Sequence, residues 1–138
     1  MTQTSAVPKQ LYAVSLASDD IAGQRRFYEA WGWQALPYSN DDYVAFQLEG
    51  AIVAFVRKAL LAEEAAPGAD APAALAWNGV TLAVNLPARD QVDPVWRSAV
   101  AAGARAVGEP VDRPWGGRSG YVADPEGNRW EIAWVPPM

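Results

Sequence analysis

The chain has 138 residues, of which 51% are hydrophobic, and a formal net charge of -5. This composition is typical of one domain with its own packed core, and the scattered Lys and Arg residues argue against general binding to nucleic acid or anionic lipid. The sequence contains no His and no Cys, which excludes disulfides, thiolate zinc sites and Ser-His-acid triads.

The N-terminal segment, MTQTSAVPKQ, does not combine a basic stretch with an apolar run. We therefore expect no secretory signal. No apolar stretch is long enough to span a bilayer. The sequence thus favours a cytoplasmic protein that contacts neither membrane nor nucleic acid.

The first predicted elements are a strand and a helix. Residues 11–17, LYAVSLA, predict the strand. Ser18 or Asp19 is expected to cap a helix over residues 20–31, because short polar side chains accept hydrogen bonds from the first turn of a helix. Gly32 is expected to end this helix.

A hairpin and a linker follow. Residues 33–38 predict a short strand that ends near a proline. Residues 43–48 and 51–56 predict two strands joined by a Glu-Gly turn. Residues 59–77 are rich in Ala, Pro and acidic side chains, and we expect a linker there with one helical turn near its start.

The second half of the chain repeats this order. It predicts a strand over residues 79–85, a helix over 93–102, a strand near 104–108 and a hairpin over 118–134. Each half therefore reads as strand, helix and three strands, which indicates a twofold internal repeat and an α+β fold. The DPEG segment at 124–127 predicts only a tight turn within the last hairpin.

The paired βαβββ units, together with FYEAWGW at 27–33 and DPEGNRWEI at 124–132, resemble the vicinal oxygen chelate superfamily. That superfamily includes glyoxalase I, extradiol dioxygenases and bleomycin-resistance proteins. The resemblance implies curved half-barrel sheets with helices on their outer face, and a homodimer. It implies a single domain over 1–138, in which modules at 10–58 and 78–136 flank the linker.

In enzymes of this superfamily, four side chains from the first and last strands of the two units hold a divalent metal. Carried over by the resemblance, these positions are Ala13, Ala54, Val80 and Glu131. Only Glu131 can coordinate a cation, and one carboxylate is far short of the donor sets that hold iron, nickel, zinc or manganese. We therefore expect no metal and no other cofactor.

Strand parity predicts what lines the groove, since alternate side chains share one face. If Glu131 points inward, Arg129 does too, and Val80, Leu82 and Val84 are expected to line the groove from the strand at 79–85 of the same unit. The lining is then mostly small and apolar. The expected ligand-binding residues are Ser15, Tyr43, Phe46, Ala54, Trp77, Val80, Leu82, Trp115, Arg118 and Glu131.

Each of these assignments has a structural alternative. Glu131 could form an ion pair with Arg129 or Arg118 and have no chemical role. The tryptophans are more often core residues than ligand contacts. Trp77 and Trp115 are the better candidates for a site because both lie in loop-like sequence.

Three functions follow from the resemblance and these residues. The first is a metal-independent protein that sequesters an aromatic or apolar drug or natural product, as bleomycin-resistance proteins do, and so confers antibiotic resistance. The second is a metal-free isomerase or lyase in which Glu131 is the catalytic general base. The third is a metal-dependent glyoxalase or dioxygenase relative with unusual ligands.

Overall fold

The computed structural model describes residues 9, 11–68 and 77–137. Its elements are β1 (Ala13–Ser18), α1 (Ile21–Ala30), β2 (Tyr43–Gln47), β3 (Ile52–Arg57), α2 (Lys58–Ala65), β4 (Thr81–Asn85), a 3-10 turn (Arg89–Gln91), α3 (Val92–Ala101), β5 (Arg105–Asp112), β6 (Arg118–Ala123) and β7 (Arg129–Trp134). The second half follows the predicted order of strand, helix and three strands, whereas the first half has two strands after its helix. None of the described helices has the length and apolarity needed to cross a bilayer.

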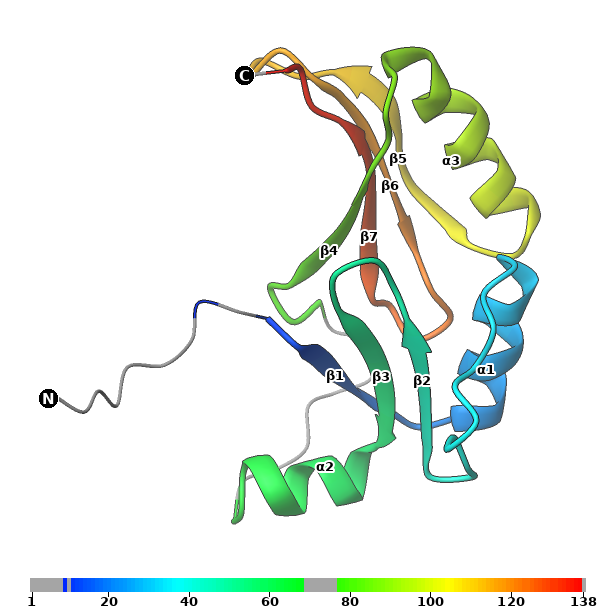
Figure 1. The fold of residues 1–138 in the computed structure, drawn as a ribbon, viewed down its shortest axis with the longest axis vertical. Coiled ribbons are helices and arrows are strands. Elements are labelled where there is room, and N and C mark those ends of the chain that lie inside the picture. The colour runs from blue at the N-terminus through cyan, green and yellow to red at the C-terminus, as the bar shows by residue number, and fades with distance from the viewer. Residues whose placement is uncertain (1–8, 10, 69–76, 138) are drawn as a thin grey trace, which may run out of the picture.

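The strands form two mixed sheets. Sheet A has the order β1-β3-β2, and sheet B has the order β4-β7-β6-β5. In each sheet the first strand runs parallel to the last strand of its own module, and the other pairs are antiparallel. The predicted α+β architecture is therefore confirmed, and the described strands form no closed barrel. Figure 1 shows α1 and α3 on the same side of the two sheets.

The two long helices have matching lengths and ends. Each spans 10 residues, and each is followed by a glycine with positive φ, Gly32 (+91°) and Gly103 (+119°). The cap of α1 is Asp20, whose carboxylate accepts a hydrogen bond from the Gly23 N–H at 3.0 Å. The predicted caps, Ser18 and Asp19, are therefore wrong. Asp19 lies one residue and Ser18 two residues before this cap, and both contact a distant turn.

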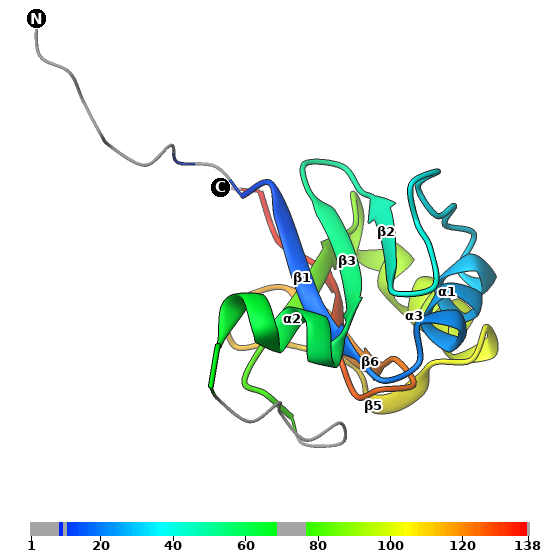
Figure 2. The same ribbon diagram turned by 90° about the horizontal axis from the view of Figure 1, so that it is seen from below.

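Two other expectations change. The predicted strand at 33–38 is reduced to an isolated bridge between Ala35 and Phe46, because Pro37 lacks an N–H for a continuous ladder. The start of the predicted linker is a full helix, α2, which packs against β1 and β3 (Figure 2). Residues 69–76 of that linker lie outside the described residues.

One apolar core joins the two modules. Tyr28 of α1 is fully buried at its centre, with its ring 4.9 Å from that of Phe55 in sheet A and 6.2 Å from that of Trp130 in sheet B. On this side of sheet A lie Val44, Phe46, Val53 and Phe55, and on this side of sheet B lie Leu82, Val84, Val122, Trp130 and Ile132. We call the faces of the two sheets that carry these residues the helix-covered faces. The opposite faces of the sheets are called the inner faces.

The turn between β6 and β7 connects the modules, and the expectation that it is only a turn is wrong. Asp124 is buried, and its carboxylate accepts hydrogen bonds from Gln24 Nε2 (2.8 Å) and the Tyr28 hydroxyl (2.7 Å) of α1. Tyr28 in turn accepts a bond from Trp130 Nε1 at 2.9 Å. A chain of hydrogen bonds thus joins Trp130 of sheet B to Tyr28 of α1, and Tyr28 to Asp124 of the turn.

Glu126 of the same turn binds the residues that immediately precede α1. Its carboxylate accepts hydrogen bonds from Ser18 Oγ (2.5 Å) and from the Asp19 backbone N–H (2.6 Å). A negative charge at the start of a helix is also favoured by the helix dipole. The turn therefore fixes both the start and the body of α1 against the second module.

Stability should fall at alkaline pH because of Tyr28. Burial first, and then the neighbouring Asp124 carboxylate, raise the pKa of the Tyr28 hydroxyl well above its ordinary value of 10.0. The unfolded chain releases this proton near pH 10, whereas the folded chain retains it, so folding is favoured below that pH and weakened above it. Urea unfolding between pH 8 and 11 should show this loss, and Tyr28→Phe should flatten it. An equal alkaline loss in Tyr28→Phe would contradict the assignment.

Candidate functional site

The inner face of sheet B carries Glu131. Its strand neighbours in the ladder are Ala83 of β4 and Tyr121 of β6. Because side chains alternate along a strand and Trp130 and Ile132 point into the core, Glu131 points away from it. The predicted inward orientation of Glu131 agrees with this register.

Tyr121 lies beside Glu131 on that face, and Arg113 lies over the Tyr121 ring. The pKa of the Tyr121 hydroxyl is raised by partial burial and then by the nearby charge of Glu131. The guanidinium carbon of Arg113 lies 5.6 Å from the centre of the Tyr121 ring, a cation–π contact. Arg113 also donates from Nε to Ser119 Oγ (2.9 Å) and from Nη2 to the Ser119 carbonyl (3.0 Å). We call Arg113, Ser119, Tyr121 and Glu131 the polar row.

Arg113 and Glu131 keep free hydrogen-bonding capacity. Neither forms an ion pair within the described part of the chain. Arg129, the predicted partner of Glu131, instead donates to the Gly127 carbonyl at 2.6 Å. The polar row therefore presents one cationic and one acidic group that a bound molecule can use.

Trp115 extends this face at one end. The turn at 113–117 is closed by hydrogen bonds from Arg113 N–H to the Gly117 carbonyl (2.8 Å) and from Gly116 N–H to the Arg113 carbonyl (3.0 Å). A Cβ at Gly117 would collide with the Trp115 ring and the Trp134 carbonyl, so only glycine lets the ring fold back there. Trp115 remains about half exposed. It offers a flat surface on the side of the sheet that carries Arg113.

The inner face of sheet B is open to solvent along its edge. Thr81, Ala83 and Asn85 of β4 all point to this side and are exposed. Along β6 the distance from Tyr121 to Gly117 is about 13 Å at ~3.3 Å per residue. The face is therefore long enough for a molecule of several rings. It is also more polar than the predicted small, apolar lining.

The inner face of sheet A is apolar but largely filled. Ala54 is buried against Ala45 and Ile52, with Tyr43 packed over them. The Tyr43 ring centre lies 5.9 Å from that of Tyr38. Ser15 lies on the same face and is exposed. Of the predicted ligand residues on this sheet, Ser15 and Tyr43 remain accessible and Ala54 does not.

Three predicted groove residues lie elsewhere. Phe46 is fully buried in the main core on the helix-covered face of sheet A. Leu82 packs on the helix-covered face of sheet B, because its pairing with Trp130 places both toward α3. Val80 precedes β4, and the first inner-face position of that strand is Thr81. The strand is thus one residue out of phase with the prediction.

Arg118 is also not a groove residue. Its guanidinium donates from Nε and Nη2 to the Asp93 carboxylate of α3, at 2.7 and 2.8 Å. A further bond runs to Asp112 at 3.2 Å. The hydrogen bond from Arg118 lowers the pKa of Asp93. Arg118 therefore links β6 to α3 on the helix-covered face, opposite the polar row.

Trp77 lies just before β4 and is exposed, with its indole nitrogen bonded to the Val80 carbonyl at 3.1 Å. Trp115 and Glu131 therefore lie on the same inner face of sheet B, and Trp77 lies near the start of its edge strand. Sequence reasoning missed Arg113, Ser119 and Tyr121. The pairing of Tyr121 with Glu131 across the last hairpin was the signal that could have found them.

The residues present do not fit a transition metal. The four implied positions, with Thr81 in place of Val80, supply one carboxylate and one hydroxyl. The described residues contain no group of three or more acidic side chains that could hold an ion. A stable site for zinc or iron needs three or four converging donors.

Comparisons with known proteins agree with this fold. The model of the glyoxalase/bleomycin resistance protein/dioxygenase superfamily matches residues 10–132. A search of functionally curated proteins finds no match. A solved structure of a glyoxalase-related enzyme from Fulvimarina pelagi is similar at 31% identity, covering 95% of this chain and 93% of that one, with a TM-score of 0.81.

Two more distant solved structures share the fold. An enzyme of the glyoxalase/bleomycin resistance protein/dioxygenase family from Burkholderia phytofirmans is 19% identical over 92% of this chain and 99% of that one, with a TM-score of 0.77. Lactoylglutathione lyase from Agrobacterium tumefaciens is 18% identical over 93% and 95% of the two chains, with a TM-score of 0.71. Both comparisons concern architecture alone.

Proposed function

The chain belongs to the glyoxalase/bleomycin resistance protein/dioxygenase superfamily, and we propose that it binds a small organic molecule on the inner face of sheet B without a metal ion. The observation that supports this proposal most is the polar row, in which Arg113, Tyr121 and Glu131 share a face with Trp115. The scaffold of the family, with the Glu131 carboxylate and the Arg113 guanidinium outside any ion pair of the described residues and with no set of metal donors, suits the recognition of a ligand.

The chemistry of the face indicates the class of ligand. The exposed ring of Trp115 suits stacking with a flat aromatic system. Arg113 can donate to a carbonyl or carboxylate oxygen, and Glu131, the ladder neighbour of Tyr121, can accept from an amine. We therefore propose an amino-bearing aromatic ketone or acid as the ligand, in a protein that sequesters it as a resistance protein of this superfamily does. The proposed assembly is the homodimer implied by the resemblance.

Calorimetric titration tests this proposal. The titrants are doxorubicin, tetracycline and bleomycin, each added to chelator-treated protein. We expect at least one to bind, and we expect Arg113→Ala to weaken its binding about 10–100-fold, since a charge-assisted hydrogen bond contributes about 1.5–3 kcal/mol. Arg118→Ala is the matched control and should change binding less than about twofold. Absence of binding by every titrant, or equal losses in the two variants, would contradict the proposal.

A second function is favoured by the contact between Tyr121 and Glu131. The Tyr121 hydroxyl is protonated at neutral pH, as burial and the neighbouring carboxylate raise its pKa further above neutrality, so it can donate a hydrogen bond to a substrate oxygen. Glu131 could then remove a proton from the carbon beside that carbonyl, while Arg113 stabilises the enolate oxygen. This is the metal-free isomerase or lyase. Exchange of the α-hydrogen of a bound ketone with deuterium, followed by NMR, would detect it.

A further inference from the structure

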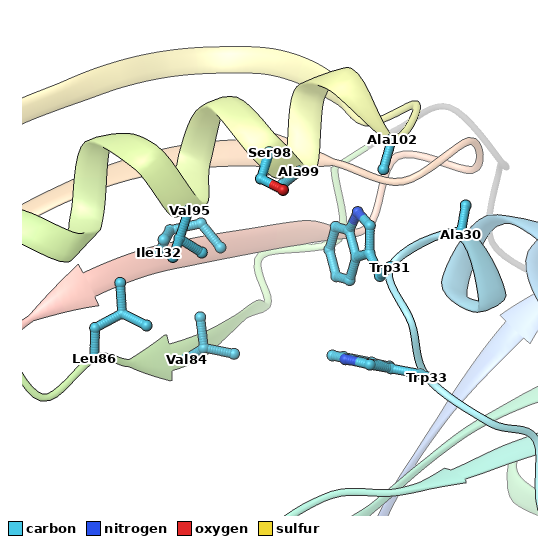
Figure 3. Close-up of a pocket in the computed structure, with 10 residues that line it drawn as sticks. All are labelled: Ala30, Trp31, Trp33, Val84, Leu86, Val95, Ser98, Ala99, Ala102 and Ile132. Atoms are coloured by element: carbon cyan, nitrogen blue, oxygen red, sulfur yellow. The ribbon is translucent and has the colours of Figure 1, made fainter.

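An apolar pocket lies between the two modules on the helix-covered side. Its volume is about 310 Å³. Trp31 and Trp33 of the first module form one wall, and Val84 of β4 and Leu86 just after it form the other. Figure 3 shows α3 along the top of this space. The pocket is on the opposite side of sheet B from the polar row.

The internal repeat explains why this space is not filled. With Gly32 and Gly103 aligned as the ends of the two helices, Phe27 corresponds to Ser98, Tyr28 to Ala99 and Trp31 to Ala102. In the first module Phe27 and Tyr28 are buried in the core, and Trp31 is partly buried against it. In the second module the corresponding side chains are small, and all three line the pocket.

The walls of the pocket determine which molecule it can hold. None of its lining residues is charged, so a charged ligand would lose its hydration without gaining a partner. The rings of Trp31 and Trp33 are 5.3 Å apart and meet at 77°, which gives a flat ligand one ring to stack on and one to meet edge-on. The volume is at the lower end of the ~300–1,000 Å³ found for small-molecule pockets.

One polar atom in the wall has no partner. The indole nitrogen of Trp31 is buried and finds no hydrogen-bond acceptor among the described residues. Figure 3 shows this nitrogen on the edge of the ring nearest α3. A buried donor without an acceptor costs about 1–3 kcal/mol. A small shift of the ring toward a ligand carbonyl would satisfy it.

From these observations we propose that the pocket between Trp31, Trp33, β4 and α3 is a second binding site, for a neutral bicyclic aromatic molecule that carries a carbonyl oxygen. This site is independent of the function proposed above, because it uses the opposite face of sheet B. It shares no residue with the polar row.

The probe for this site is prodan, a neutral naphthalene with a ketone, whose emission shifts to shorter wavelength in an apolar environment. We expect saturable binding with that shift. In the ¹⁵N–¹H spectrum, prodan should move the indole signals of Trp31 and Trp33, assigned from Trp31→Phe and Trp33→Phe, and leave those of Trp77 and Trp115 in place. Movement of Trp115 in place of Trp31 and Trp33 would overturn the proposal.

A double variant, here called the filled variant, introduces into α3 the aromatic side chains found at the corresponding positions of α1. Ser98→Phe with Ala102→Trp should reduce prodan affinity at least tenfold, whereas Arg97→Phe, which adds a ring on the exposed side of the same helix, should not. Glu131→Gln should leave prodan binding unchanged, which separates this site from the proposed function. Unchanged affinity in a folded filled variant would overturn the proposal. So would loss of prodan binding as the protein dimerises with rising concentration, because the pocket would then be covered by a second copy.

Discussion

Asp124→Ala should lower the free energy of unfolding by roughly 3–5 kcal/mol, since removing one member of a buried, charged hydrogen-bond network leaves its partners without acceptors. Asp124 accepts from Gln24, Tyr28 and Asn128 side chains and from the backbone N–H groups of Glu126 and Asn128. Alanine would leave all of these donors unpaired. Urea unfolding, followed by tryptophan fluorescence and by circular dichroism, measures the loss.

A matched control is Asp42→Ala. Asp42 pairs with Arg57 at 2.7 Å, but both side chains are about half exposed. Exposed ion pairs contribute about 0–1 kcal/mol, so this variant should unfold almost as the parent does. Similar losses in the two aspartate variants would show that the buried turn does not hold the modules together.

Glu131→Gln should weaken binding of an amino-bearing ligand such as doxorubicin about 10–100-fold, because the amide has no charge to pair with the ammonium group. The amide is nearly the same size as the carboxylate and keeps one oxygen, so the fold should persist. Calorimetry of the parent and the variant at one salt concentration measures the change. A titrant without an amine should bind both proteins equally.

The same variant separates the two proposed functions. If Glu131 is a general base, Gln should leave the affinity for a neutral ketone nearly intact and abolish deuterium exchange at its α-carbon. If Glu131 only recognises an amine, no exchange occurs in the parent and affinity alone falls. Equal binding of doxorubicin by parent and variant, with no exchange in either, would contradict both functions.

The fold was predictable from local patterns. The predicted helices at 20–31 and 93–102 and the two hairpins depend on interactions between near neighbours, and each of these elements is present within a residue or two. The resemblance to the superfamily extended these elements to a paired architecture, which the structure and the family match confirm.

The face on which each strand side chain lies depends on the pairing register between strands, which contacts between residues distant in sequence determine. Val80, Leu82 and Val84 were expected in the groove, although they are the apolar set of their strand. Burial of apolar surface places Leu82 and Val84 against the core and turns Thr81 and Ala83 outward. The register of β4 differs by one residue from the prediction, so its inner-face and core-face side chains are exchanged. Alternation of side chains also places Arg118 and Glu131 on opposite faces of sheet B, since Arg118 pairs with Trp134.

The role of the DPEG turn could not be read from its own sequence. Asp124 and Glu126 satisfy turn geometry locally, but their partners in and before α1 lie about 100 residues earlier in the chain. Only the packing of one module on the other brings Gln24 and Tyr28 to Asp124. Arg113 was missed for a related reason, since its partners become neighbours only through the pairing of β5 with β6.

The central claim is that a small organic molecule binds on the inner face of sheet B through the polar row. The arginine Nε signals in a ¹⁵N–¹H spectrum of chelator-treated protein test it directly, with Arg113 and Arg118 assigned from their alanine variants. On addition of doxorubicin, tetracycline or bleomycin, the Arg113 signal should move with saturation while the Arg118 signal stays in place. Movement of Arg118 alone, or no movement of Arg113 with any of the three, would contradict the claim.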